Sequence, residues 1–195
     1  MPVRSLARAL PAALAAAALV TPAAAGARTS GHAVASAAGA PKRCSFTHVV
    51  PTRRNMRKVR RAILCLHNQI RARHHLPLLR INRRLGRAAV GHSSSMVRQR
   101  YFDHTDPNGA TFVQRIMRAR YVRPNQGWSL GENIAWGTGR LSTPAGVMRA
   151  WMHSPGHRAN ILRRSYREVG IGIKLGVPTA GKTGATFTID FGARS

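Results

Sequence analysis

Histidines and acidic residues are the side chains through which this chain could do chemistry. The stretch WMHSPGHRANIL, residues 151–162, places His153 and His157 four positions apart. On one face of a helix, that spacing supplies the two imidazoles of the His-Glu-x-x-His zinc motif. Here Pro155 breaks the helix between the two histidines, so the pair cannot imitate that motif.

The supply of carboxylates is small enough to consider in full. The chain has five acidic residues, which are Asp103, Asp106, Glu132, Glu168 and Asp190. We expect Asp103 and Asp106 to stabilise a turn. Glu168 and Asp190 are interpreted as structural charges, with Asp190 pointing outward from a strand. Glu132 lies in the apolar stretch around "GEN", where a buried carboxylate without a partner would be costly, so we expect it to pair with a histidine.

The first part of the chain predicts export. Residues 1–25 combine early arginines, an apolar run and small residues at the end, which is typical of a secretory signal peptide. Residues 26–43 are rich in Ala, Gly and Ser and predict a flexible linker. The ordered domain should occupy residues 44–195. Since no segment is apolar enough to cross a bilayer, we expect a secreted, extracellular protein that is a monomer.

Export also determines how the two cysteines are interpreted. In an oxidising compartment, Cys44 and Cys65 are expected to form a disulfide, although a pair of unpaired buried thiols is the alternative. Closing this loop stabilises the fold by about 3 kcal/mol in the chain-entropy model. A disulfide would leave no thiolate to act as a nucleophile.

Net charge is the strongest compositional signal. The chain has 32 Lys and Arg residues against 5 Asp and Glu, a formal net charge of +27. Such a surface attracts anionic polymers, and this attraction weakens steeply with salt. The basic residues are nevertheless spread along the chain without a nucleic-acid-binding motif. A solvated arginine-rich surface is therefore favoured over a specific polyanion site.

Periodicity predicts helices early in the chain and strands late. Apolar residues recur at helical spacing over 55–74 and 82–100, and a short helix is expected from Phe112 to Ala119. His92 lies on the apolar stripe of the second helix, so we interpret it as a hydrogen-bonded core residue and not a ligand. Thr143 and Pro144 predict the start of another helix. The stretch SLGENIAWGTG fits a segment lining a cavity as well as it fits a strand, and two short strands follow in EVGIGIKLG and ATFTIDFG. This order predicts an α+β domain.

From about Ala62 to Gly192 the sequence resembles the CAP superfamily, named for cysteine-rich secretory proteins, antigen 5 and pathogenesis-related 1, and especially its bacterial secreted SCP-like members. The motifs that carry the resemblance occur in this order: LCLHNQIRARHHLPLLRIN, YFDHTDPNG, GENIAWG, WMHSPGHRANIL, EVGIGI and IDFG. The resemblance implies an α-β-α sandwich, in which helices flank a small antiparallel sheet and the motifs build a surface cleft.

The resemblance also implies which residues line that cleft. By motif, the histidines are His104 and His157 and the acid is Glu132. The two histidines are the implied ligands of a divalent metal such as zinc. The second acid of eukaryotic relatives falls near Ser154, so this chain lacks it, and His153 is peripheral. Two imidazoles with at most one carboxylate give two or three protein ligands, whereas a structural zinc site usually has four. A hydrogen-bonded cluster without metal is the alternative.

Three functions remain open from the sequence. The first is a non-catalytic secreted module that binds a lipid, a sterol-like molecule or a cell-wall ligand. The second is a metal-dependent, peptidase-like hydrolase, with Glu132 acting beside a metal-bound water. The third is an extracellular polyanion-binding protein. The binding module is preferred, because no nucleophile triad is visible and the second acid is missing.

Overall fold

The computed structural model describes residues 43–123, 125–180 and 182–195. The predicted signal peptide, residues 1–25, lies outside the described residues, and so does the predicted linker except for Arg43. The described residues therefore belong almost entirely to the domain expected over residues 44–195.

Helices α1 (Met56–Arg73), α2 (Arg83–Gln99), α3 (Phe112–Arg118) and α4 (Pro144–His153) match the segments predicted from the sequence. The structure adds the short 3-10 helix η1 (Gly139–Ser142) and the helix α5 (Pro155–Leu162), which the sequence analysis does not predict. The Thr143 side chain accepts a hydrogen bond from the N–H of Gly146 at the start of α4, as its position before Pro144 predicts. Pro155 ends one helix and begins the next, so His153 and His157 lie on different helices.

The strands form a single four-stranded sheet in the order β1-β3-β4-β2. The strands are β1 (Arg80–Ile81), β2 (Trp128–Gly137), β3 (Glu168–Leu175) and β4 (Ala185–Arg194). The SLGENIAWGTG stretch is thus a long strand. Antiparallel pairing joins β2, β4 and β3, but β1 pairs with β3 in parallel. The three long strands thus form the small antiparallel sheet that the resemblance implies, and the two-residue β1 adds a short parallel pair at its edge.

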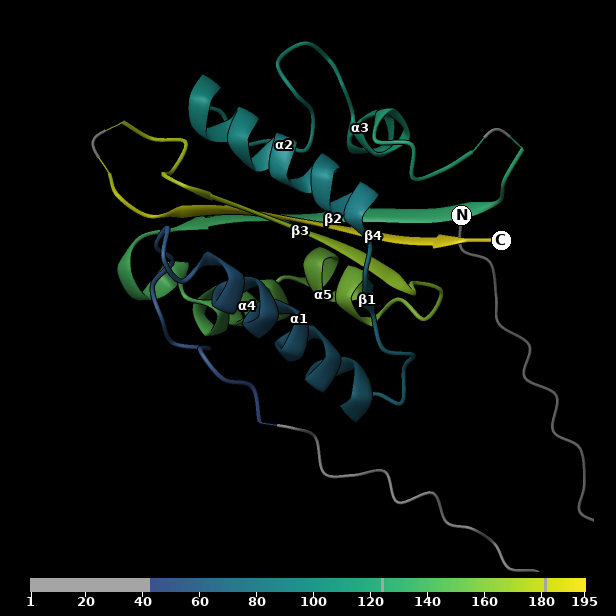
Figure 1. Ribbon diagram of the computed structural model, residues 1–195, viewed down its shortest axis with the longest axis horizontal. Helices are drawn as coiled ribbons and strands as arrows, with labels where there is room; N and C mark the ends of the chain where they lie inside the picture. Colours follow the sequence, from purple (N-terminus) through teal and green to yellow (C-terminus); the bar gives the residue numbers. More distant parts are fainter. Residues whose placement is uncertain (1–42, 124, 181) are drawn as a thin grey trace, which may run out of the picture. The chain divides into compact units, whose positions relative to one another are not determined.

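Helices cover both faces of this sheet, which makes the α-β-α sandwich (Figure 1). The α1, α4 and α5 helices lie on one face, and α2 and α3 on the other. On the α1 face, Ile171, Phe187 and Phe191 join Val59 and Trp151 in the larger apolar core. The smaller core lies between the sheet and the helices α2 and α3.

Asp190 shows that α2 and α3 also bury the polar face of β4. Apolar and polar residues alternate along β4, yet every residue from 185 to 192 is buried. The polar side faces α2, where Thr188 accepts a hydrogen bond from the Ser93 hydroxyl at 2.8 Å. Asp190 is only 1% exposed. The prediction that Asp190 points outward is wrong, because alternation alone cannot tell a solvated face from one covered by a helix.

Two glycines in β3 let α2 approach the sheet closely. A Cβ at Gly170 would overlap the backbone of Leu85, and one at Gly172 would overlap the backbone of Ala89. Close packing at these points sets the position of α2, and with it the loop that follows α2.

The predicted disulfide between Cys44 and Cys65 is present and ties the segment before α1 to that helix. Arg71, also on α1, is fully buried, and its guanidinium donates hydrogen bonds to the carbonyl oxygens of Pro77, Ile161, Arg163 and Tyr166. Within the described part of the chain, no helix has the length and apolar character needed to cross a membrane.

Candidate functional site

Glu132 is the centre of the candidate site. It lies in the middle of β2, an edge strand of the sheet, and its side chain is 1% exposed. Its Oε1 accepts a hydrogen bond from Nδ1 of His104 at 2.8 Å, and its Oε2 accepts one from Nη2 of Arg115 at 2.7 Å. Both carboxylate oxygens therefore have partners, as the burial of a charge requires.

His104 lies in the loop after α2 and is the exposed member of this pair. Its side chain is 48% exposed, in contrast to Glu132. Because a carboxylate can only accept, Nδ1 of His104 carries the proton in this hydrogen bond. In the neutral imidazole, Nε2 is then the basic nitrogen, so Glu132 fixes both the ring and its tautomer.

His157 lies in the first turn of α5, which packs on the opposite face of the sheet from α2. Asparagine amides join this turn to β2: Asn133 Nδ2 donates to the carbonyl oxygen of His157 at 3.0 Å, and Asn160 Nδ2 donates to that of Glu132 at 3.1 Å. Burial lowers the pKa of His157, and the nearby charge of His104 lowers it further. The two histidines are therefore close enough to influence each other's charge. His153 is exposed, and its Nδ1 bonds to the carbonyl oxygen of Arg149 at 2.8 Å.

A second layer of polar residues lies beneath Glu132. Arg115 on α3 contacts Oδ1 of Asp106 at 3.2 Å as well as Glu132. The same Asp106 oxygen accepts from the Tyr101 hydroxyl at 2.7 Å and lies 2.9 Å from Nδ1 of His92. Asp106 thus connects the loop to α2 and α3 in addition to its backbone role in the turn.

His92 is fully buried and hydrogen-bonded, as predicted for a core histidine. Its Nε2 lies 3.0 Å from the carbonyl oxygen of Asp103 and 3.9 Å from Oε1 of Glu132. Burial is the main reason why its pKa is lowered. Through the carbonyl oxygen of Asp103, His92 also supports the loop that carries His104.

Asp190 is the directly opposite neighbour of Glu132 in the β2–β4 register. Burial raises the pKa of Asp190 well above its usual range, and the neighbouring Glu132 charge raises it further. Two carboxyl groups side by side in one buried site disfavour the charged form of Asp190.

Motif resemblance selected three residues, His104, Glu132 and His157, which we call the His/Glu cluster. His104 and Glu132 contact each other directly, whereas His157 is linked to β2 through its backbone carbonyl and to His104 through the effect of charge on its pKa. Sequence reasoning missed the contributions of Arg115, Asp106 and Asp190. The scarcity of acidic residues could have indicated the Arg115 contact, because a buried carboxylate in an arginine-rich chain is expected to pair with a guanidinium.

The comparisons with known proteins agree with this fold and these motifs. Residues 64–187 match the model of the CAP family, the cysteine-rich secretory protein family. The match covers more than half of the chain, and the chain belongs to this family.

Two curated relatives come from the bacterium Bacillus subtilis. The Bacillus subtilis protein YkwD is 36% identical over 109 residues, which cover 55% of this chain and 39% of YkwD. The membrane protein YlbC of the same organism is 33% identical over 111 residues, covering 57% of this chain and 30% of YlbC. The chain thus spans well under half the length of the curated relatives that it matches.

Two solved bacterial structures have a similar fold. An extracellular SCP-domain protein from Bacillus anthracis is 29% identical, with a TM-score of 0.54, over 70% of this chain and 43% of that protein. An outer surface protein of Borrelia burgdorferi is 21% identical, with a TM-score of 0.59, over 76% of this chain and 99% of that protein. The second likeness concerns the fold alone.

Proposed function

We propose that this CAP protein is a secreted, non-catalytic binding module in which His104 and His157 hold a divalent cation such as zinc. The observation that carries the proposal is the hydrogen bond from Nδ1 of His104 to Glu132 at 2.8 Å. Carboxylates that orient a metal-binding imidazole in this way fix its tautomer and raise its basicity.

Two histidines fit a cation site in which the remaining ligands are exchangeable. Among the described residues there is no group of three or more His, Cys, Asp or Glu side chains arranged to hold a metal ion. A cation on His104 and His157 would therefore need water or a ligand at its other positions, whereas a structural zinc site has four protein ligands. The lowered pKa of His157 keeps its imidazole neutral near pH 7, the state that ligation requires.

The environment of Glu132 disfavours the hydrolase alternative. A general base must reach the water that it deprotonates, yet both Glu132 oxygens accept hydrogen bonds from protein donors and the side chain is 1% exposed. Glu132 is therefore assigned a positioning role. The ligand expected from the sequence, a lipid, a sterol-like molecule or a cell-wall fragment, stays a prediction of this proposal.

Thermal unfolding with and without Zn²⁺ tests the proposal. A cation that binds only the folded protein raises Tm as its concentration passes Kd. We expect His104→Ala and His157→Ala to abolish this rise and Glu132→Gln to weaken zinc affinity about 10–100-fold. His153→Ala is the matched control, because His153 lies on α4, apart from the cluster, and should leave the rise unchanged.

Two outcomes would count against this proposal. If Zn²⁺ leaves the Tm of the wild-type protein unchanged, the cluster is a hydrogen-bonded tie between loops and not a cation site. If Glu132→Gln removes an esterase or peptidase activity while the folded protein persists, the hydrolase alternative replaces the binding module.

A further inference from the structure

The edge of the sheet opposite the His/Glu cluster is largely open. Strand β1 pairs with β3 only at Glu168 and Val169, so no strand of the described chain pairs with residues 170–175 on that side. The carbonyl oxygen of Val169 accepts from the N–H of Asn82 at 2.9 Å. Since backbone groups alternate in direction along a strand, those of Ile171 and Ile173 point to the same open side.

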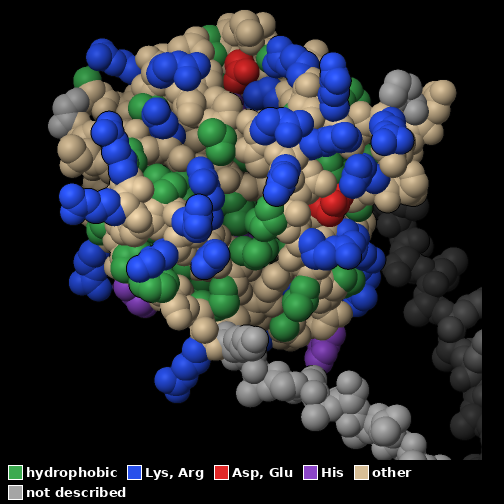
Figure 2. All heavy atoms as spheres, viewed as in Figure 1, with side chains coloured by type: hydrophobic (Ala, Val, Ile, Leu, Met, Phe, Trp, Pro, Cys, Tyr) green, Lys and Arg blue, Asp and Glu red, His purple; other side chains and the backbone are tan. Residues whose placement is uncertain are grey.

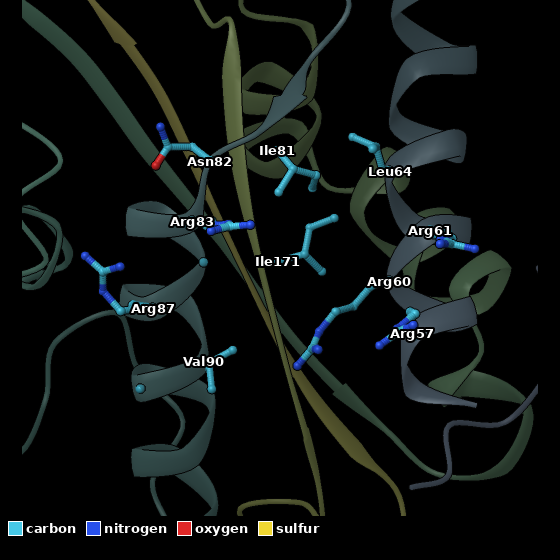
Figure 3. A pocket seen from close by; sticks show the side chains of 12 residues that line it. Arg57, Arg60, Arg61, Leu64, Ile81, Asn82, Arg83, Arg87, Val90 and Ile171 are labelled. Atoms are coloured by element: carbon cyan, nitrogen blue, oxygen red, sulfur yellow. The ribbon is translucent and has the colours of Figure 1, made fainter. Parts of the chain in front are cut away.

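A groove follows this edge. It is a cavity of about 690 Å³ between α1 and α2, and we call it the edge groove. Leu64 of α1, Val90 of α2 and Ile171 of β3 give it apolar walls. Its volume lies within the range of roughly 300–1,000 Å³ that is usual for ligand sites. Figure 3 shows Ile171 between the two helices.

Two glycines of α2 widen the groove at a cost to the helix. Gly86 and Gly91 line it, and a Cβ at either position would meet nothing within 4 Å. A glycine inside a helix destabilises it by roughly 0.5–1 kcal/mol relative to alanine. Unlike Gly170 and Gly172, these glycines are not required by close packing, and their effect is to leave space beside the open strand.

The rim of the groove is strongly cationic. It is formed by Arg57, Arg60 and Arg61 of α1 and by Arg83 and Arg87 of α2, and none of the lining residues is acidic. Figure 2 shows apolar side chains in the middle of this face with Lys and Arg around them.

Arg60 has an unsatisfied hydrogen-bonding group. Its side chain reaches from α1 toward the space between the helices (Figure 3). Its Nε is buried and has no hydrogen-bond partner within the described part of the chain. An acceptor brought by a ligand would remove this cost.

We propose that the edge groove binds an extended acidic peptide, which adds to β3 as a further strand beyond the end of β1. The position beside β3 already holds a strand where β1 lies, so its width suits a polypeptide backbone. The peptide's main chain would pair with Ile171 and Ile173, as in other cases of strand addition. Alternate side chains would place carboxylates toward the α1 arginines and apolar groups toward Gly86 and Gly91.

A labelled peptide of alternating glutamate and valine tests this site by fluorescence anisotropy. We expect it to bind, and we expect amide hydrogen exchange at Ile171 and Ile173 to slow when it does. The double variant Arg57→Gln/Arg60→Gln should weaken binding about tenfold. The matched control removes two exposed arginines outside the groove, Arg98 on α2 and Arg149 on α4, and should change affinity much less.

Three further measurements separate strand addition from charge attraction. A peptide N-methylated at alternate residues keeps its charge but cannot pair, so it should not bind. Gly91→Leu should block the groove in a protein that stays folded, because the added side chain enters open space. Equal binding by the N-methylated peptide, or binding of a labelled long-chain fatty acid in place of the peptide, overturns the proposal. These results are independent of His104 and His157, so the cation proposal stands or falls separately.

Discussion

At the scale of single residues, burial shifts the pKa values of several ionisable groups in the direction that favours their neutral forms. Burial raises the pKa of Asp190 beside Glu132, while burial lowers the pKa of His92. The strongest case is His67 on α1, where burial lowers the pKa from 6.5 to about 4. Its Nδ1 bonds to the carbonyl oxygen of Ile63 at 2.8 Å, while its buried Nε2 has no partner within the described residues.

His67 should make stability depend on pH. The unfolded chain takes up a proton near pH 6.5 and the folded protein only near pH 4, so the unfolded state binds more protons between these values. The free energy of unfolding therefore falls as pH decreases through this window, by about 3 kcal/mol from this residue. His67→Leu should remove that part of the loss, as measured by urea unfolding near both ends of the window. An unchanged pH dependence in the variant would show that His67 is not the responsible group.

At the scale of elements, glycines have two different roles. Gly170 and Gly172 permit contact between β3 and α2, whereas Gly86 and Gly91 leave open space on α2. The same substitution should therefore have opposite effects at the two kinds of position.

We expect Gly172→Ala to destabilise the domain by about 2 kcal/mol or more, because its Cβ would overlap the backbone of Ala89. Gly91→Ala should stabilise it by about 0.5–1 kcal/mol through helix propensity alone. Denaturant midpoints of the two variants provide the measurement. A stable Gly172→Ala protein would mean that α2 can move away from the sheet without cost.

The element scale also shows what the sequence could and could not predict. Helix boundaries followed from periodicity and from the cap Thr143, because these signals act within a few residues of chain. The sheet was harder, because the β1–β3 pairing and the burial of Asp190 depend on segments far apart in sequence. For the same reason, motif resemblance selected the residues of the His/Glu cluster, but nothing local indicated that Arg115 or Asp190 would lie against Glu132.

At the scale of the whole molecule, positive charge dominates. A net charge of +27 should attract anionic polymers wherever they occur, and Lys and Arg side chains are scattered across the face in Figure 2. Such attraction is separate from both proposed sites.

We expect the protein to bind a short duplex DNA, used only as a generic polyanion, with an affinity that falls on the order of 10³-fold or more between about 50 and 200 mM salt. His104→Ala and Gly91→Leu should leave this behaviour unchanged, because neither removes a lysine or an arginine. Binding that persists at high salt would instead indicate a specific polyanion site, which the dispersed arginines do not predict. Electrophoretic mobility shift at several salt concentrations makes the comparison.

The arginines beside β3 also affect how copies of this chain meet one another. An unpaired strand edge ordinarily invites self-association and aggregation. Here two such edges could join only by bringing their guanidinium groups together without intervening anions, and like-charge repulsion opposes that encounter. The residues that would attract an acidic peptide therefore also keep the open strands of two molecules apart.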